Sequence, residues 1–287
     1  MAVRILVDST FDFTEEQLRE LGLDVVRMRV HFGNEEFIDG LNITPREFYE
    51  RLVESDTLPT TSQATPADFA EHYEKLTANG DQVVAMTISS ALSGTYQSAV
   101  IAAEDFPGRV RVVDTLSATM GAQILARYAL TLTGSGLDMD AVADRLDEAK
   151  KRIHIIALLD TLEYLKRGGR ISAAAAAVGS VFSIKPVITI RDGAVAVIGK
   201  ARGSKNGSNL LSQMIEKYGV DFSMPYTLGY TGISDAMLIK YRDDSARLWT
   251  GHTDNLPVMT IGSVIGTHAG PGAIGVAFFG ERSHDGE

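Results

Sequence analysis

Hydroxyl-bearing side chains gather behind a short apolar run in the first third of the chain. Residues 83–88 are apolar without alternation and rich in β-branched side chains, which is typical of a strand buried on both faces. A helix is predicted over 96–105, and the turn between the two carries four donors: Ser89, Ser90, Ser93 and Thr95. Because a helix start after a parallel strand presents free N–H groups and the positive end of the helix dipole, this turn predicts an anion-binding site.

The residue types in the turn indicate the kind of anion. No lysine or arginine lies between Ser89 and Ser98, whereas phosphate loops of the GxxxxGK[ST] type place a lysine on the phosphates. The predicted anion is therefore a carboxylate with a single charge rather than a triphosphate. Serine and glycine are also frequent capping residues in front of helices, so a purely structural turn is an equal alternative.

Two enzymatic alternatives stay open. Ser93 and His268 would make a hydrolase pair, although residues 91–94 do not match the G-x-S-x-G elbow that exposes a nucleophile. Asp8 and Asp114, each at the end of a predicted strand, would hold magnesium for phosphotransfer, although capping is the commoner role of such residues. His268 stands between two apolar segments, where a structural histidine is more common than a catalytic one.

No cofactor and no metal site is predicted. The chain contains no cysteine, and its six histidines show no i,i+4 pairing, so a zinc site is not expected. No G-x-G-x-x-G sequence follows the first predicted strand, which argues against a dinucleotide site. Carboxylate binding is the interpretation that uses all of the hydroxyl-rich turns at once.

The elements that carry these residues repeat one unit: a strand, a hydroxyl-rich turn and a helix. The sequence predicts strands at 4–7, 83–88 and 110–113, and helices at 14–21, 96–105 and 119–132. Such alternation favours a parallel sheet covered by helices on both faces, with ligands at the carboxyl ends of the strands. Residues 59–63 and 65–68 add further hydroxyls, so four loops rich in serine and threonine are expected to converge on one polar spot.

The second half of the chain has a different character. It is predicted to contain helices at 139–152, 173–181, 204–218 and 235–249, a short helix closed by Gly168-Gly169, strands at 154–158 and 226–230, a hairpin at 185–198 around Asp192-Gly193, and two strands within 258–279 joined by a turn with His268 at its mouth. Antiparallel pairing is absent from the first half and marks a second domain. The predicted fold is therefore α/β with two domains: residues 1–153 as a three-layer α/β/α domain with a parallel sheet, and residues 154–287 as an α/β domain with a mixed sheet.

Composition excludes several classes of protein. Of the 287 residues, 45% are hydrophobic and 22% are charged, and no apolar run approaches the roughly 20 residues needed to cross a bilayer. The chain passes directly into a strand without a signal-peptide pattern, so a cytoplasmic location is expected. The net charge of −10 argues against non-specific nucleic-acid binding, which relies on lysine and arginine at the phosphates.

Positive charge is concentrated in one region of this acidic chain. Between residues 160 and 210 there are eight lysines and arginines against three acidic residues. A basic region on an acidic protein indicates a surface for an acidic partner or a phosphorylated group. A solvated face with scattered ion pairs is the structural alternative.

Six segments resemble the DegV family, and they occur in the same order over about residues 4–280. They are Val-Asp-Ser-Thr at 7–10, Pro-Thr-Thr-Ser-Gln at 59–63, the block 89–99, Leu-Glu-Tyr-Leu-Lys-Arg-Gly-Gly-Arg-Ile at 162–171, Lys-Ala-Arg-Gly at 200–203 and His-Ala-Gly-Pro-Gly-Ala at 268–273. The resemblance implies two α/β domains with a long-chain fatty acid buried between or beneath them. It also implies a role as the substrate-binding (FakB-type) subunit of a bacterial fatty acid kinase, a carrier that a separate ATP-binding subunit phosphorylates and that is not catalytic alone.

The resemblance also assigns roles to residues. Thr61 and Ser93 would bind the carboxylate, with Ser62, the Gly94 amide and His268 in the surrounding network. Arg202 would lie on the face offered to the kinase subunit, and Lys166 and Arg170 of the same basic region are expected to face this partner as well. A protein that senses lipid and signals to a partner is an alternative, transient membrane contact is compatible with either role, and acyl preference and oligomeric state stay open.

Apolar residues at several positions are candidates for the wall around the acyl chain, although residues at such spacings belong to a core by default. They are Met28, Met86, Met120, Leu158, Ile171, Phe182, Ile184, Ile188 and Phe278. At about 0.8 kcal/mol for each buried methylene, a chain of about 16 carbons gains more than about 10 kcal/mol before the costs of binding are subtracted. We therefore expect a tightly held lipid.

Overall fold

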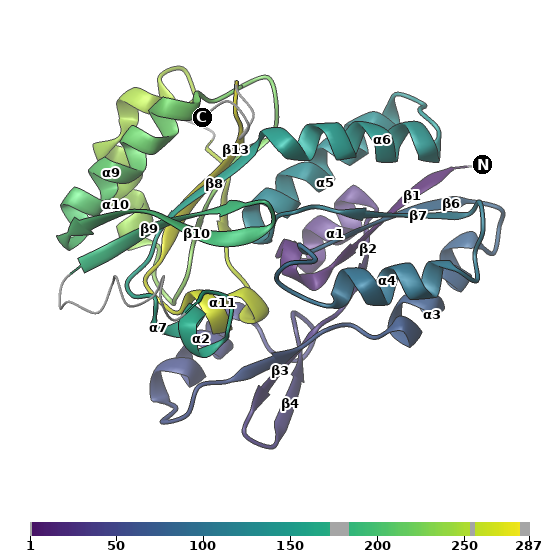
Figure 1. Ribbon diagram of the computed structural model, residues 1–287, viewed down its shortest axis with the longest axis horizontal. Helices are drawn as coiled ribbons and strands as arrows, with labels where there is room; N and C mark the ends of the chain where they lie inside the picture. The colour runs from purple at the N-terminus through teal and green to yellow at the C-terminus, as the bar shows by residue number, and fades with distance from the viewer. Residues whose placement is uncertain (1, 173–183, 253–255, 282–287) are drawn as a thin grey trace.

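Three β-sheets form the frame of the part of the chain that the structure describes (Figure 1). The computed structural model describes residues 2–172, 184–252 and 256–281. The first sheet is parallel, with the strand order β2-β1-β6-β7, and contains β1 (Val3–Asp8), β2 (Asp24–Val26), β6 (Gln82–Thr87) and β7 (Val110–Asp114). The carboxyl ends of β1, β6 and β7 therefore lie at one edge of the sheet, as the alternation of strands and helices predicts.

Helices cover both faces of this sheet because successive strand residues point to opposite sides. Ile5 and Val7 pack with the helices α1 (Glu15–Leu21), α5 (Thr119–Gly134) and α6 (Met139–Ala149). Leu6 packs on the other side with α2 (Pro45–Glu54), α3 (Pro66–Thr77) and α4 (Thr95–Ala103). The predicted three-layer α/β/α arrangement is confirmed.

The second sheet is mixed, with the strand order β10-β9-β8-β13-β11-β12. Its strands are β8 (Ile153–Leu158), β9 (Ile184–Arg191), β10 (Ala194–Arg202), β11 (Tyr226–Tyr230), β12 (Val258–Thr260) and β13 (Ile274–Phe279). β9 and β10 form the predicted hairpin, in which Asp192 (φ 50°) and Gly193 (φ 78°) are both left-handed. Two left-handed central residues are what a type I′ turn requires, so the Asp-Gly pair explains this turn.

Helix α5 lies between the two large sheets. Its buried residues share one core with β1 and β6 and also with Ile155, Ala277 and Phe279 of the mixed sheet. The opposite face of the mixed sheet is covered by α9 (Gly203–Tyr218) and α10 (Ala236–Asp244), which pack on Leu158 and Phe278. Side chains that alternate along β8 and β13 therefore enter two separate cores.

A third, antiparallel sheet was not predicted. It contains β3 (Arg29–Phe32), β4 (Glu35–Ile38) and β5 (Thr60–Ser62) in the order β4-β3-β5. Residues 59–63 were expected to form a loop, but the backbone of β5 pairs with β3, with Thr61 opposite Val30. This pairing joins segments about thirty residues apart, which the local pattern around Thr61 does not encode.

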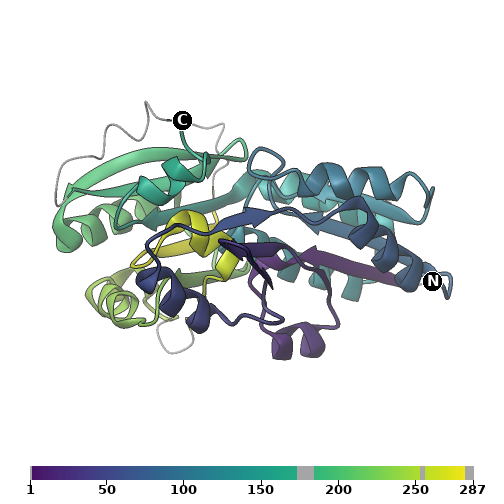
Figure 2. The same ribbon diagram turned by 90° about the horizontal axis from the view of Figure 1, so that it is seen from below.

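The prediction of two strands within 258–279 is wrong in part. The segment contains the short strand β12, the helix α11 (Ser263–Ala269) and the strand β13. Val264, Gly266 and Thr267 of α11 are buried, and the helix packs against α2, β3 and β5 (Figures 1 and 2). Tertiary packing thus overrides the β-branched composition of this segment, and His268 lies on a helix rather than in a turn.

Two predicted helices end earlier than expected. The helix predicted at 139–152 is α6, followed by a 3-10 turn at Lys150–Arg152. The helix predicted at 235–249 breaks after α10, where Ser245 Oγ donates to the carbonyl of Tyr241 and accepts from Trp249 Nε1. This serine competes with the helical backbone hydrogen bonds. The predicted helix at 173–181 and the predicted lipid contact Phe182 lie outside the described residues.

The change from parallel to mixed sheet occurs at β8, close to the predicted boundary at residue 153. The division into two domains stays a prediction, because α5 and α11 each pack against elements of both halves. Among the helices that the structure describes, none combines the length and apolarity required to span a membrane.

Candidate ligand-binding site

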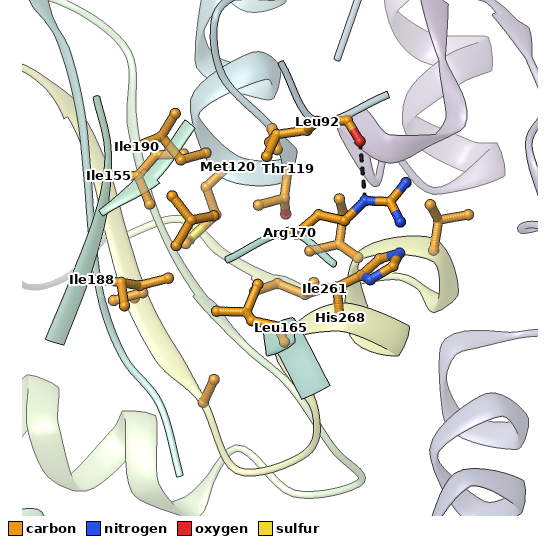
Figure 3. A pocket seen from close by; sticks show the side chains of 18 of the residues that line it. Leu92, Thr119, Met120, Ile155, Leu165, Arg170, Ile188, Ile190, Ile261 and His268 are labelled. Carbon is orange, nitrogen blue, oxygen red and sulfur yellow. Dashed lines mark hydrogen bonds between the residues drawn. The ribbon is translucent and has the colours of Figure 1, made fainter. Parts of the chain in front are cut away.

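A cavity lies where α5, α11 and the short helix α7 (Glu163–Arg167) meet the mixed sheet (Figure 3). About 870 Å³ of space lies between its atoms when the solvent at its open mouth is included. Its wall is mostly apolar and includes Met28, Ile88, Met120, Ile155, Ala157, Leu159, Leu165, Ile188, Ile190, Val195, Ile261, Val264, Ile265 and Ile274. Such a wall suits a long apolar ligand.

Polar side chains gather on one side of the cavity. Thr61, Ser93, Arg170 and His268 line it and come from four separate parts of the chain. Thr61 Oγ1 and His268 Nε2 form a hydrogen bond of 3.0 Å. Arg170 Nε donates to the carbonyl of Leu92 at 3.1 Å, and Figure 3 shows the guanidinium beside the His268 ring. One cation and several neutral groups therefore meet at the cavity, a set that suits a carboxylate with a single charge.

His268 is uncharged at neutral pH. Burial lowers the pKa of its imidazole to about 4, and the positive charge of Arg170 contributes to the shift. The ring is enclosed on both sides: its Nε2 bonds to Thr61 Oγ1, and its Nδ1 packs against Gly168, where an added Cβ would stand only 2.1 Å away. Within the described residues Nδ1 has no hydrogen-bond partner. Among the described residues that line the cavity, Arg170 supplies the one formal positive charge.

Two buried carboxylates from the first half of the chain anchor the start of α11. Asp39 accepts a hydrogen bond from Ser263 Oγ and another from the N–H of Ser263. Asp12 accepts from the N–H of Gly262 and, at 2.5 Å, from Thr119 Oγ1. Burial raises the pKa of both carboxyls, and the charge of Asp39 adds to the shift at Asp12. These contacts hold the helix that presents His268 to Thr61.

We expect His268→Gln to flatten the dependence of stability on acid pH. The imidazole has a pKa of about 4 in the folded protein against its ordinary value of 6.5, so the unfolded chain binds a proton in this interval that the folded protein does not. Stability should therefore fall as the pH drops from about 6.5 through about 4, by on the order of 1.4 kcal/mol for each unit of the pKa difference.

The measurement is urea unfolding of both proteins from neutral pH to about pH 4. Asp8 works in the opposite direction: burial raises its pKa to about 6, so its contribution is lost as the pH rises through about 6. Asp8 is present in both proteins, so its contribution cancels when the stability profile of His268→Gln is compared with that of the wild type. Parallel profiles for the two proteins would show that His268 is not the group responsible.

The structure brings three of the five predicted ligand-binding residues together at the cavity. Thr61, Ser93 and His268 line it. Ser62 points away, because side chains alternate along β5, and its Oγ bonds to His31 Nε2 at 3.1 Å. Gly94 is the N-cap residue of α4 and packs against the Gln63 side chain, outside the cavity wall.

The anion-binding turn contributes fewer hydroxyls to the cavity than predicted. Ser89 Oγ donates to the carbonyl of Gly193 at 2.8 Å, across to the β9–β10 hairpin. Thr95 Oγ1 pairs with Ser93 Oγ at 2.9 Å and approaches Met28 Sδ at 3.6 Å. Ser90 is exposed. Ser93 is therefore the hydroxyl of this turn that lines the cavity.

Arg170 was predicted on a partner-facing surface, and its half-buried side chain lies at the cavity. The side chain lines the cavity and bonds to the carbonyls of Leu92 and Gly168. Gly169 adopts a left-handed conformation (φ 72°) behind α7, which turns the chain so that Arg170 faces inward. In the sequence, the Gly168-Gly169 pair signals that the helix ends here, but it does not show toward which side of the protein the next residue points. Lys166 and Arg202 are exposed.

Five candidate tail contacts lie outside the cavity wall, and three line it. Met28, Met120 and Ile188 line the cavity. Leu158 and Phe278 point to the opposite face of the mixed sheet, beneath α9 and α10, because the strand alternation places them there. Met86 is in the core under α5 and α6. Ile171 packs in a small cluster beside the cavity, and Ile184 stands at the start of β9.

The geometry does not assemble the enzymatic alternatives. His268 Nε2 bonds to Thr61 and Ser93 Oγ bonds to Thr95, so the two groups are engaged elsewhere. Asp8 accepts from the N–H groups of Thr10 and Ile88, and Asp114 accepts from the N–H groups of Ser90 and Leu116. Asp8 caps the 3-10 turn at Ser9–Phe11, and Asp114 fixes the backbone of the loops after β6 and β7. Among residues 2–172, 184–252 and 256–281, no group of three or more acidic or histidine side chains is placed to hold a metal ion.

Comparisons with known proteins agree with this architecture. A family model described as "Uncharacterised protein, DegV family" matches residues 2–281. A DegV domain-containing protein of Deinococcus radiodurans is 34% identical over 282 residues, which cover 96% of this chain and 98% of that protein.

Solved structures show the same fold. A DegV family protein of Thermus thermophilus, described by its fatty acid binding, is 33% identical with a TM-score of 0.86, covering 98% of this chain and 100% of that chain. A DegV lipid-binding protein of Thermotoga maritima is 28% identical with a TM-score of 0.84, covering 99% and 100% of the two chains. With a family match over nearly all of its length and the α/β architecture of these relatives, the chain belongs to the DegV family.

Proposed function

We propose that this protein binds a long-chain fatty acid, with the carboxylate at Thr61, Ser93, Arg170 and His268 and the acyl chain in the apolar cavity. The observation that carries the proposal is the placement of a single cation and neutral donors at one side of an otherwise apolar cavity. An amphiphile with one negative charge matches this distribution.

The relatives support this assignment. The Thermus thermophilus protein is described by its fatty acid binding, and a protein of Eubacterium ventriosum that is 25% identical with a TM-score of 0.84 is described as binding stearic acid. The energetics agree, because a buried acyl chain gains about 0.8 kcal/mol for each methylene. A chain of the usual length should therefore remain bound through purification.

The first test is denaturing mass spectrometry of an organic extract from the purified protein. A straight-chain fatty acid in stoichiometric amount is the expected result. A protein that carries no fatty acid and takes up none from solution would contradict the proposal and return attention to the enzymatic alternatives.

Thr61→Ala and Ser93→Ala should each weaken fatty-acid binding by about 1 to 2 kcal/mol. Each substitution removes one hydroxyl donor to a charged carboxylate, and such hydrogen bonds have about this value. Isothermal titration with a fatty acid gives the affinity. Ser62→Ala is the matched control, because it removes the neighbouring hydroxyl that points to His31 instead. Equal losses in Ser62→Ala and Thr61→Ala would place the carboxylate elsewhere.

We also propose that the protein presents its fatty acid to a separate ATP-binding kinase subunit and is not catalytic alone. The support is the exposed basic residue Arg202 at the start of α9, in a region where positive charge is concentrated. A lipid-sensing role without phosphorylation would need the same cavity. Copurification with a kinase subunit, followed by phosphorylation of the bound acid, distinguishes the two.

Arg202→Ala should lower the rate of kinase-dependent phosphorylation while fatty-acid affinity stays unchanged. Removing one charge from the edge of a docking surface mainly lowers the rate of association, here by on the order of tenfold at low salt. The measurement is the phosphorylation rate against protein concentration, with the affinity for the fatty acid determined in parallel. Lys240→Ala, an exposed charge on α10 paired with Asp244, is the control. Loss of lipid binding in Arg202→Ala would contradict the docking role.

A further inference from the structure

A row of small residues crosses the mixed sheet at the cavity. Ala157 on β8 pairs with Gly275 on β13, and Gly275 pairs with Gly229 on β11. Residues opposite one another in a sheet share a face, and Ala157 and Gly275 line the cavity. The row continues to Ile188 on one side and to Met259 on the other. The sheet therefore has a trough that leads away from the cavity between two large side chains.

The Met120 side chain fills this trough. A Cβ on Gly229 would stand 2.6 Å from Met120 Sδ, and a Cβ on Gly275 would stand 2.7 Å from Met120 Cε. Real Cβ atoms do not approach other atoms so closely, so both glycines are required for this placement of the thioether. Met120 is 1% exposed and itself lines the cavity. It is the boundary between the cavity and the remainder of the trough.

Met120 lies away from the carboxylate-binding groups. Figure 3 shows it together with Ile155 and Ile190 on the side of the cavity away from His268 and Arg170. An acyl chain whose carboxylate contacts His268 and Arg170 would therefore extend toward Met120. A methionine has three flexible side-chain torsions and adapts to its neighbours, unlike a branched side chain.

We propose that Met120, seated on Gly229 and Gly275, is the residue that limits the length of the acyl chain. The inference rests on the proposed fatty-acid binding and adds the determinant of its selectivity. The end of the acyl chain contacts the Met120 thioether, and longer chains must displace it along the trough toward Met259. One methylene in an apolar pocket changes affinity by about 10- to 200-fold, so a boundary of this kind is sufficient to discriminate between neighbouring chain lengths.

The test measures the affinities of a homologous series of saturated acids, from lauric to arachidic acid. Met120→Ala removes the thioether and opens the trough, so the ratio of affinities for arachidic over palmitic acid should rise by about tenfold or more. Gly229→Ala should lower the same ratio by about tenfold, because the added methyl pushes Met120 into the cavity. Gly229 is not among the residues that line the cavity. An added Cβ would stand 2.6 Å from Met120 Sδ but 3.5 Å from Ile261 Cγ1, an ordinary contact, so we expect its effect to pass through Met120.

Met28→Ala is the matched control. It removes the same atoms from the same cavity, but Met28 lies beside Thr95 at the carboxylate end. We expect it to weaken all acids by a similar factor and to leave the ratio unchanged. The ratio is measured within one preparation of each variant, so a lower folded fraction does not alter it. Thermal unfolding of each variant identifies any that fails to fold, and if Met120→Ala does not fold, the expected fall of the ratio in Gly229→Ala decides the proposal.

The outcomes separate the two proposals. If the unchanged protein binds none of the acids, the proposed function fails. If it binds them and neither Met120→Ala nor Gly229→Ala changes the ratio, or Met28→Ala changes it as much, the role of Met120 is refuted while fatty-acid binding stands. In the double variant Met120→Ala/Gly229→Ala, the fall in the affinity ratio caused by Gly229→Ala should disappear, because the Met120 side chain that the added methyl displaces is gone.

Discussion

Arg170→Ala should reduce the affinity for fatty acids by about 100-fold, the largest effect of any single change at the cavity. Removing one partner of an enclosed, hydrogen-bonded charge pair costs about 2 to 5 kcal/mol. Arg170 is the cation among the residues that line the cavity, and its bond to the Leu92 carbonyl fixes the guanidinium in the direction of the hydroxyl groups. Without it, the acyl carboxylate would be desolvated with neutral donors alone.

Isothermal titration of wild type and Arg170→Ala with a fatty acid gives this value directly. Arg167→Ala is the control: it removes the same charge three positions away, from an exposed side chain that pairs with Glu163. The methyl ester of the acid adds a second control, because an uncharged head group should bind both proteins with similar affinity. Equal losses for Arg170→Ala and Arg167→Ala would indicate a long-range effect of charge rather than a contact.

Phe48→Ala is expected to lower the free energy of unfolding by about 3 to 5 kcal/mol, the range for a fully buried aromatic side chain. Phe48 on α2 is fully buried and packs against Phe32 and Tyr49, with ring centroids 5.8 and 5.0 Å away. Its ring also lies against Gly266 of α11, where an added Cβ would be 2.8 Å from it. The substitution therefore leaves a cavity beneath the helix that holds His268.

Urea unfolding measures the loss of stability, and titration under folding conditions measures the effect on the site. Phe69→Ala is the matched control, because Phe69 is equally buried and packs on Tyr73 rather than on α11. Both variants should lose stability, and Phe48→Ala alone should also weaken fatty-acid binding. An unchanged affinity in Phe48→Ala would mean that the anchors at Asp12 and Asp39 suffice to hold α11.

Local signals in the sequence predicted much of the frame. The helix predicted at 14–21, which has Thr14 as its N-cap, and the Asp192-Gly193 turn are found as expected, because capping and turn conformation depend on neighbouring residues. The apolar run at 83–88 is the central strand β6. Boundaries shifted where a side chain competes with the backbone, as Ser245 does after α10.

The site was predicted only in part, because its residues meet through long-range contacts. Thr61 lies on an unpredicted strand, and Arg170 reaches the cavity after a left-handed glycine. His268 was placed in a turn, although the packing of α11 on α2 makes this segment helical. No local pattern in the sequence around these three residues predicts that they lie close together in the folded protein.

The sequence by itself determined the α/β class, the parallel first sheet and the hairpin, since each depends on periodicity or on residue types within one turn. Tertiary structure alone decided which side chains face the cavity. A strand places its residues alternately on two faces, so Ile155 and Ala157 line the cavity while Leu158 enters the other core. Hydrophobicity is the same on both faces, and only the packing of α5, α9 and α11 distinguishes them.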